Sequence, residues 1–116
     1  MPIAISLVPN NVDASASNFV YAIATLTFSG SYPSGGDTLD FTSIADKLAS
    51  ALVPVQVFAE SQNGNGGYYI AVQGSALNNW KLKCFNAGGT ELTAGAYPAS
   101  VTTDVVQLTL TLRKLL

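Results

Sequence analysis

The sequence has no histidine and a single cysteine, Cys84, and these two scarcities exclude most catalytic chemistry. Without histidine there is no Ser-His or Cys-His nucleophile pair and no imidazole ligand for a metal. One cysteine cannot form a disulfide within the chain or a metal site built from several thiolates. We therefore predict that the protein is not an enzyme, has no catalytic residues, and uses no metal and no other cofactor.

Charge is also scarce. Five basic and seven acidic residues make up 10% of the 116-residue chain, whereas an ordinary soluble domain contains about 25% charged residues. The net charge of −2 provides no positive field for nucleic acid, since each phosphate contact uses a lysine or arginine. We predict no nucleic-acid partner.

Long apolar runs are absent as well. The most apolar segment, Phe19 to Phe28, is interrupted by Thr25 and Thr27 and is far shorter than the roughly 20 residues that span a membrane. The segment from Met1 to Pro9 lacks the basic region of a signal peptide. We expect no membrane partner, and synthesis and assembly in a reducing cytoplasm, where a free cysteine persists.

The scarcity of charge is uneven along the chain. Residues 14–36 and residues 61–80 carry no charge at all. A free monomer usually has mixed charges on its surface and guards its sheet edges with lysine or proline. The pattern therefore predicts that another chain covers part of the surface. The alternative is that a surface rich in serine and threonine is enough to keep the protein soluble.

Alternating apolar and polar residues predict β-strands through most of the chain. In the clearest strand, Val106, Leu108, Leu110 and Leu112 face one way. The predicted strands are 3–8, 19–29, 55–60, 68–73, 80–85, 90–93 and 106–113, with a brief extended piece at 38–41. We predict an all-β fold, an antiparallel β-sandwich or partly closed barrel of about seven strands with one short helix, forming a single domain over residues 1–116.

The one predicted helix runs from Ile44 to Ala51. Ser43 has the chemistry of an N-cap, and Asp46 follows three residues later, as in a capping box. Leu48 continues the apolar face of this helix, and Pro54 prevents its continuation.

Loop residues supply the candidate interaction site. Tyrosine is favoured in interfaces because it gives a large contact area at low entropic cost. The alternative for each tyrosine is packing within a turn. The predicted interface residues are Tyr32, Pro33, Asp37, Tyr68, Tyr69 and Tyr97.

Three other candidates have structural interpretations. Asp37 and Asp40 form a close acidic pair, but calcium needs six to eight oxygen ligands, so we predict turn capping instead. Cys84 lies in the inward phase of its strand, as a small hydrophobic residue. The basic residues Lys81, Lys83, Arg113 and Lys114 would form a positive face for an acidic partner if strands 80–85 and 106–113 were neighbours. Otherwise they are solvated charges.

One run of residues resembles a known family. Phe28-Ser-Gly-Ser-Tyr-Pro-Ser-Gly-Gly-Asp-Thr-Leu-Asp-Phe41 resembles a pattern of small head-associated structural proteins of tailed bacteriophages, in which a Gly-x-Tyr loop precedes a Gly-Gly-Asp-x-Leu-Asp element. The stretches 80–85 and 91–98 and the closing strand occupy similar places. The resemblance implies a capsid decoration, or cement, protein that binds the major capsid protein on the exterior of the virion, as a trimer or dimer and without a cofactor.

A second function is compatible with the same sequence features. A carbohydrate- or receptor-binding module of a phage tail or cell surface would share the β-sandwich and the exposed tyrosines. For shell binding, the predicted contact elements are the loops around residues 32–36 and 63–69 and the N-terminal segment 2–11. That segment could equally be an ordinary edge strand.

Overall fold

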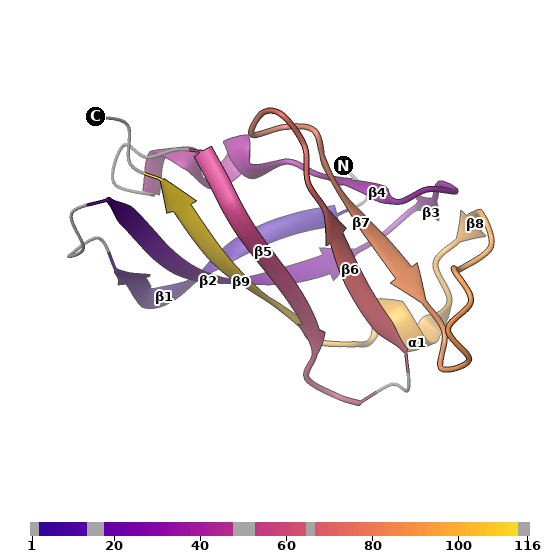
Figure 1. Cartoon of the computed structure of the whole chain (residues 1–116). Coiled ribbons are helices and arrows are strands. Elements are labelled where there is room, and N and C mark those ends of the chain that lie inside the picture. Colours follow the sequence, from indigo (N-terminus) through magenta and orange to yellow (C-terminus); the bar gives the residue numbers. More distant parts are fainter. Residues whose placement is uncertain (1–2, 14–17, 48–52, 65–66, 114–116) are drawn as a thin grey trace.

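Two antiparallel sheets form the protein. The computed structural model describes residues 3–13, 18–47, 53–64 and 67–113. The large sheet has the strand order β1 (Ile3–Asp13), β2 (Phe19–Phe28), β9 (Val106–Arg113), β5 (Val53–Ser61). The small sheet has the order β4 (Asp37–Leu39), β7 (Trp80–Phe85), β6 (Tyr68–Val72). The sheets form the two layers seen in Figure 1 and confirm the predicted all-β, sandwich-like fold.

Three smaller pieces complete the chain. A two-residue pairing joins β3 (Ser31–Tyr32) to β8 (Gly95–Ala96). A 3₁₀-helix, η1, spans Phe41–Lys47, and a single α-helical turn, α1, spans Ala99–Thr102. The sequence predicts none of β3, β8 and α1, because a two-residue strand and a one-turn helix are too short to produce a periodic pattern.

The large sheet is built on the alternation that its sequence predicts. Strands β2 and β9 lie in the middle of the sheet, so their inward side chains are covered by the second layer. Small residues of β2 stand opposite large ones of β9, as at Ala24 and Leu108. The buried side chains of the two strands are Val20, Ala22, Ala24, Leu26, Phe28, Val106, Leu108, Leu110 and Leu112.

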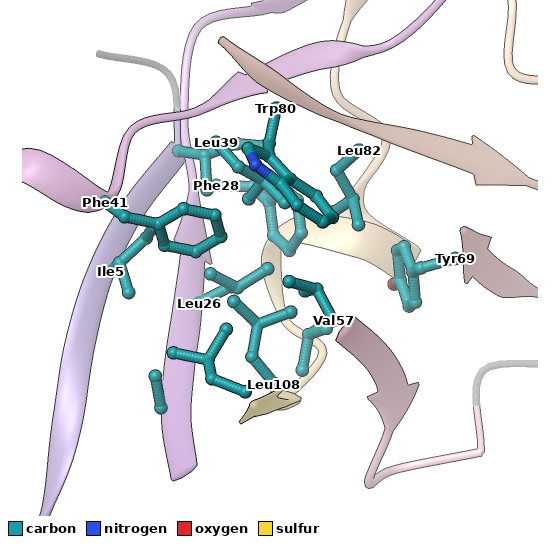
Figure 2. Close-up of a cluster of buried hydrophobic side chains, with 14 of the residues drawn as sticks. Ile5, Leu26, Phe28, Leu39, Phe41, Val57, Tyr69, Trp80, Leu82 and Leu108 are labelled. Atoms are coloured by element: carbon teal, nitrogen blue, oxygen red, sulfur yellow. The ribbon is translucent and has the colours of Figure 1, made fainter. Parts of the chain in front are cut away.

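The core lies between the two sheets (Figure 2). Leu26 and Leu108 of the large sheet face Leu82 and Trp80 of the small sheet. The indole of Trp80 meets the ring of Phe41 edge-on, with ring centres 6.1 Å apart. Fully burying a side chain of this kind stabilises the fold by about 1.5–3 kcal/mol, so the inward alternation of both sheets supplies the main driving force for folding.

The predicted end of the first strand and the predicted strand at 90–93 were both wrong. The turn-like residues 9–11 do not end the first strand, because β1 continues to Asp13 with a shift of register between Leu7 and Val12. A proline is tolerated there since β1 is an edge strand and the irregularity interrupts its pairing. The strand expected at 90–93 is reduced to one bridge between Phe85 and Glu91.

The start of the predicted helix was also wrong. The helix begins at Phe41 rather than Ile44, and it is a 3₁₀-helix over the described residues. Its first turn is capped by Asp40, whose Oδ1 accepts hydrogen bonds from the backbone N–H of Thr42 (3.0 Å) and from its hydroxyl. Ser43 instead donates to the carbonyl oxygen of Asp40 at 3.3 Å. Residues 48–51 of the predicted helix lie outside the described residues.

The condition for a positive face is not met. Lys81 and Lys83 lie on β7 in the small sheet, whereas Arg113 lies on β9 in the large sheet. Lys114 lies outside the described residues. Lys81 and Lys83 therefore belong to a different layer from Arg113, and the alternative of separate solvated charges fits these three residues.

The capping geometry gives a first prediction. Replacing Asp40 by alanine removes the acceptor for the Thr42 N–H and should lower the free energy of unfolding by about 1 kcal/mol. Ser43→Ala should change it by less than about 0.5 kcal/mol, because Ser43 makes only a long, exposed hydrogen bond. Urea unfolding of both variants checks this, and equal losses would contradict the assignment of the cap to Asp40.

Candidate functional site

Three of the predicted interface tyrosines meet inside the protein. Tyr32, Tyr69 and Tyr97 are all at least nine-tenths buried. They surround Phe28 at one end of the sandwich. The rings of Phe28 and Tyr69 are stacked at 5.8 Å, and Tyr97 lies 5.3 Å from Phe28 and 5.8 Å from Tyr32. These three residues therefore pack between elements of the fold, rather than within a turn, and little of their surface is available to a partner.

Each buried phenol donates a hydrogen bond to a carboxylate. Tyr97 donates to Asp37 at 2.5 Å, and Tyr69 donates to Asp104 at 2.8 Å. Both carboxylates are themselves more than nine-tenths buried. Asp104 also accepts from the hydroxyl of Ser61 at 2.8 Å. Because a buried carboxylate is costly unless hydrogen bonds satisfy it, these groups are structural parts of the fold.

The third pair lies at the surface end of the cluster. Tyr32 donates to Glu91 Oε2 at 2.5 Å, and the same oxygen accepts from the backbone N–H of Gly35 at 2.8 Å. The hydroxyl oxygen of Tyr32 accepts from the backbone N–H of Cys84 at 3.3 Å. This pair therefore ties the loop that follows β3 to the segment that follows β7.

The pKa shifts show that Tyr32, Tyr97 and Glu91 each keep one protonation state near neutral pH. Burial, followed by the hydrogen bond to Asp37, raises the pKa of Tyr97 above its ordinary value of 10.0. Burial and then the bond to Glu91 raise the pKa of Tyr32 in the same way. The hydrogen bond from Tyr32, followed by that from Gly35, lowers the pKa of Glu91 below its ordinary value of 4.5. At neutral pH both phenols are protonated donors and Glu91 is an ionised acceptor.

Cys84 is buried between the sheets, as its position in the strand predicted. Burial, with smaller contributions from the charges of Asp37 and Glu91, raises the pKa of its thiol to about 12. Since the thiolate is the reactive form, this cysteine is inert near neutral pH.

The acidic pair Asp37 and Asp40 does not converge on one site. Asp37 is held by Tyr97 and by the backbone N–H of Thr38, whereas Asp40 caps η1. Within the described ranges, no group of three or more cysteine, aspartate or glutamate side chains is placed to hold a metal ion. Asp37 thus has a structural role in its turn, as predicted, whereas Asp40 caps η1, a role that the sequence had indicated for Ser43.

The run that carries the family resemblance builds this end of the fold. Gly36 has a φ of +112°, and a Cβ there would lie 3.2 Å from the carbonyl oxygen of Leu82 on the neighbouring strand. Asp37 then binds Tyr97, Leu39 enters the core, and Asp40 caps the helix. The motif is therefore a structural signature.

The broad outer side of the large sheet is uncharged across its centre. Antiparallel pairing places Tyr21 beside Thr111, and Thr111 beside Gln56. It also sets Ile23 beside Thr109. We call this surface the neutral face. It consists of Ala4, Ser6, Tyr21, Ile23, Thr25, Thr27, Gln56, Gln107, Thr109 and Thr111, all exposed or partly exposed. On β5 it is bordered by Phe58, which pairs with Thr109, and by Glu60, which pairs with Gln107.

Among the described residues, the charged groups of this side stand at the ends of the face and at its β5 border. Asp13 lies at the end of β1, Arg113 at the end of β9, and Glu60 near the end of β5. Alternation predicted which residues of β2 and β9 point outward, but only the strand order shows that β1 and β5 extend the same face.

A second exposed surface borders the small sheet. A groove of about 340 Å³ runs between β5 and β6 and is lined by residues 57–60 and 69–71. Two predicted interface residues are exposed: Tyr68 lies beside this groove on β6, and Pro33 lies in the turn after β3. A smaller hollow of about 210 Å³ reaches Trp80, but that indole is only 3% exposed and offers little surface for stacking on a ligand.

Comparison with protein-family models, with curated proteins and with solved structures finds no match. In the part of the chain that the structure describes, no helix has both the length and the apolar character needed to cross a membrane.

The tyrosine cluster gives a second prediction. Tyr97→Phe keeps the ring but leaves the buried Asp37 without its phenol donor, so the free energy of unfolding should fall by about 1–3 kcal/mol. Tyr68→Phe is the matched control, because Tyr68 is 44% exposed and its hydroxyl can be hydrated. Chemical denaturation measures both variants. An equal effect of the two substitutions would show that the Asp37 contact contributes nothing.

A third prediction concerns pH. Because the pKa of Glu91 is lower in the folded protein than in the unfolded chain, its contribution to stability is present above pH 4.5 and is lost as the pH falls through the folded value. Unfolding free energies of the wild type and Glu91→Gln, measured from neutral pH to about pH 3, should therefore converge at the acidic end. A constant difference across that range would contradict the coupling.

Proposed function

We propose that this protein is a structural protein of a tailed-phage virion, a capsid decoration protein that binds the major capsid protein on the outside of the head shell. It works by binding, without catalysis or a cofactor, and as a homo-oligomer. The observation that carries the proposal is the neutral face, a four-stranded surface with no charge at its centre.

The chemistry of the neutral face suits a large protein partner. Burying a charged group without a partner is costly, and the ten residues of this face contain none. Threonine, glutamine and tyrosine side chains can donate and accept hydrogen bonds across a contact. The charge-free stretch 14–36 of the sequence contributes β2 to this face, so the scarcity of charge has a definite location in the fold.

The size of the face is appropriate as well. Strands about 4.8 Å apart, with outward residues about 6.6 Å apart along each strand, spread over a flat area of roughly 20 Å by 20 Å. Side-chain relief and the surrounding rim add to this area. The contact is then of the order of the 800 Å² per partner that is typical of specific complexes.

A rigid scaffold behind the face supports the same function. A protein that reinforces a shell must keep its shape under load, and the three tyrosine–carboxylate pairs tie segments that are 35 to 60 residues apart in the sequence. The family resemblance in residues 28–41 supports the proposal, because its residues build this scaffold. No observation favours the glycan-binding alternative, since Trp80 is buried and the exposed Tyr68 is stacked against Phe85.

Co-sedimentation with undecorated phage heads tests the proposal. The wild type should sediment with heads and saturate at a fixed ratio to the capsid subunits. Thr109→Glu, which places a charge at the centre of the neutral face, should weaken binding by about 100-fold, because the charge is buried without a partner. Thr93→Glu is the control, since Thr93 is exposed outside that face, and it should bind as the wild type does.

Two outcomes would contradict the proposal. Equal binding by Thr109→Glu and the wild type would remove the neutral face from the contact. No binding to any head, together with thermal stabilisation by a glycan, would instead favour the carbohydrate-binding module.

A further inference from the structure

Most of the large exposed apolar side chains gather beside the groove between β5 and β6, where the β5 border of the neutral face meets the small sheet. Among the described residues, Phe58 is 54% exposed on β5, and Tyr68, Ile70 and Val72 are 44%, 46% and 38% exposed on β6. The ring of Tyr68 stacks flat on Phe85 of β7, with ring centres 4.9 Å apart. We call these five residues the seam surface, because they follow the groove between the two sheets.

The strand edges along this groove are also unpaired on one side in the described chain. Strands β5 and β6 are the last strands of their sheets, and β5 pairs only with β9 while β6 pairs only with β7 in the described chain. The two strands lie side by side (Figure 1), and their sheets do not join there. Strand β6, Tyr68–Val72, has neither lysine nor proline to discourage association.

Charges of opposite sign border the seam surface on its two sides. Glu60 lines the groove from β5, while Lys83 stands beside Ile70 on β7. Consider two copies facing each other. A two-fold axis parallel to the strands brings the Glu60 side of one copy over the Lys83 side of the other. An axis across the strands would bring like charges together, which is unfavourable.

We propose that the seam surface is a self-association face, on which a second copy of this chain packs its own seam surface about a two-fold axis parallel to β6. The contact is isologous, so each Glu60 meets the Lys83 of the other copy. Ile70 lies near the axis and is covered by the partner. The proposed function includes a homo-oligomer but no interface for it, so the new element is the contact surface and its axis, and this contact does not depend on the shell.

Sedimentation equilibrium of the purified 116-residue chain, without heads, tests the dimer. We expect a species of twice the 12.0 kDa chain mass. Ile70→Lys should raise the dissociation constant by about 100-fold, since it buries an unpaired charge at the centre of the contact. Val105→Lys is the matched control because Val105 is 45% exposed, against 46% for Ile70. A wild type that is monomeric at all concentrations would overturn the proposal.

Charge reversal tests the orientation. Glu60→Lys and Lys83→Glu should each weaken the dimer, and the double variant should restore it because the pair is then reversed. A double variant that is weaker than either single one would exclude the proposed axis.

A thiol placed near the axis gives an independent measurement. Ile70→Cys should form a covalent dimer under mild oxidation by dioxygen, which accepts the two electrons released when the thiols join. The wild type should not, because its only cysteine is buried with a thiol pKa of about 12. Ile70→Cys that stays uncrosslinked would count against contact at this position.

The test separates this dimer from the proposed function. If the wild type is monomeric and Ile70→Lys abolishes co-sedimentation with heads, the seam surface is the shell contact and the dimer is overturned. If the dimer forms but no head is bound, the self-association face stands and the decoration function fails.

Discussion

The hydrogen bond between a buried phenol and a buried carboxylate is the interaction on which the rest of this structure depends. Neither group is stable inside a protein alone, because the phenol loses its water and the carboxylate loses far more. Paired, as in Tyr97 with Asp37 and Tyr69 with Asp104, they satisfy each other while the rings fill the end of the core. Each pair joins segments distant in sequence, so the end of the sandwich closes only when both sheets and the β3–β8 pairing are in place.

This internal use of polar groups explains the unusual surface. Three of the five tyrosines and two of the seven acidic residues are buried in the described structure. A chain that has few charges and buries some of them leaves neutral hydroxyl and amide groups to cover its outer sheet. The small number of charged residues therefore explains the neutral face, while the burial of two of them contributes to the rigid end of the core. The exposed side chains of the seam surface differ from this polar surface because they are apolar.

The sequence allowed the strands to be predicted better than their arrangement. Alternation is a local property, so the inward residues of β2 and β9 and the burial of Cys84 could be predicted. Sheet order depends on contacts between distant segments, and that is why Lys83 and Arg113 could not be assigned to separate sheets. The helix start was misplaced because Ser43 and Asp40 both have capping side chains, and only the backbone path shows that Asp40 occupies the capping position.

The residue types of the candidate site could be predicted from the sequence, but their positions in the fold could not. The chemistry of tyrosine is equally compatible with an interface and with packing in a turn. A tyrosine is buried here when a carboxylate lies close enough to accept a hydrogen bond from its hydroxyl. Glu91 and Asp104 provide those carboxylates for Tyr32 and Tyr69, yet their spacing from the tyrosines follows no local pattern. A weak signal was present, since Glu91 and Asp104 are isolated charges in otherwise uncharged segments.

The two proposed surfaces have consequences for each other. A dimer formed through the seam surface carries two neutral faces, one on each copy, because the two surfaces meet only at β5 and the β1, β2 and β9 parts of the neutral face lie beyond it on the outer side of the large sheet. When both faces bind neighbouring positions of a repeating shell, the second contact forms at a high effective concentration. A weak neutral interface, without any charge pair, then suffices for stable attachment. The two proposals are in this sense complementary, since a dimer through the seam surface would be bivalent and bivalency would strengthen a contact made by the neutral face.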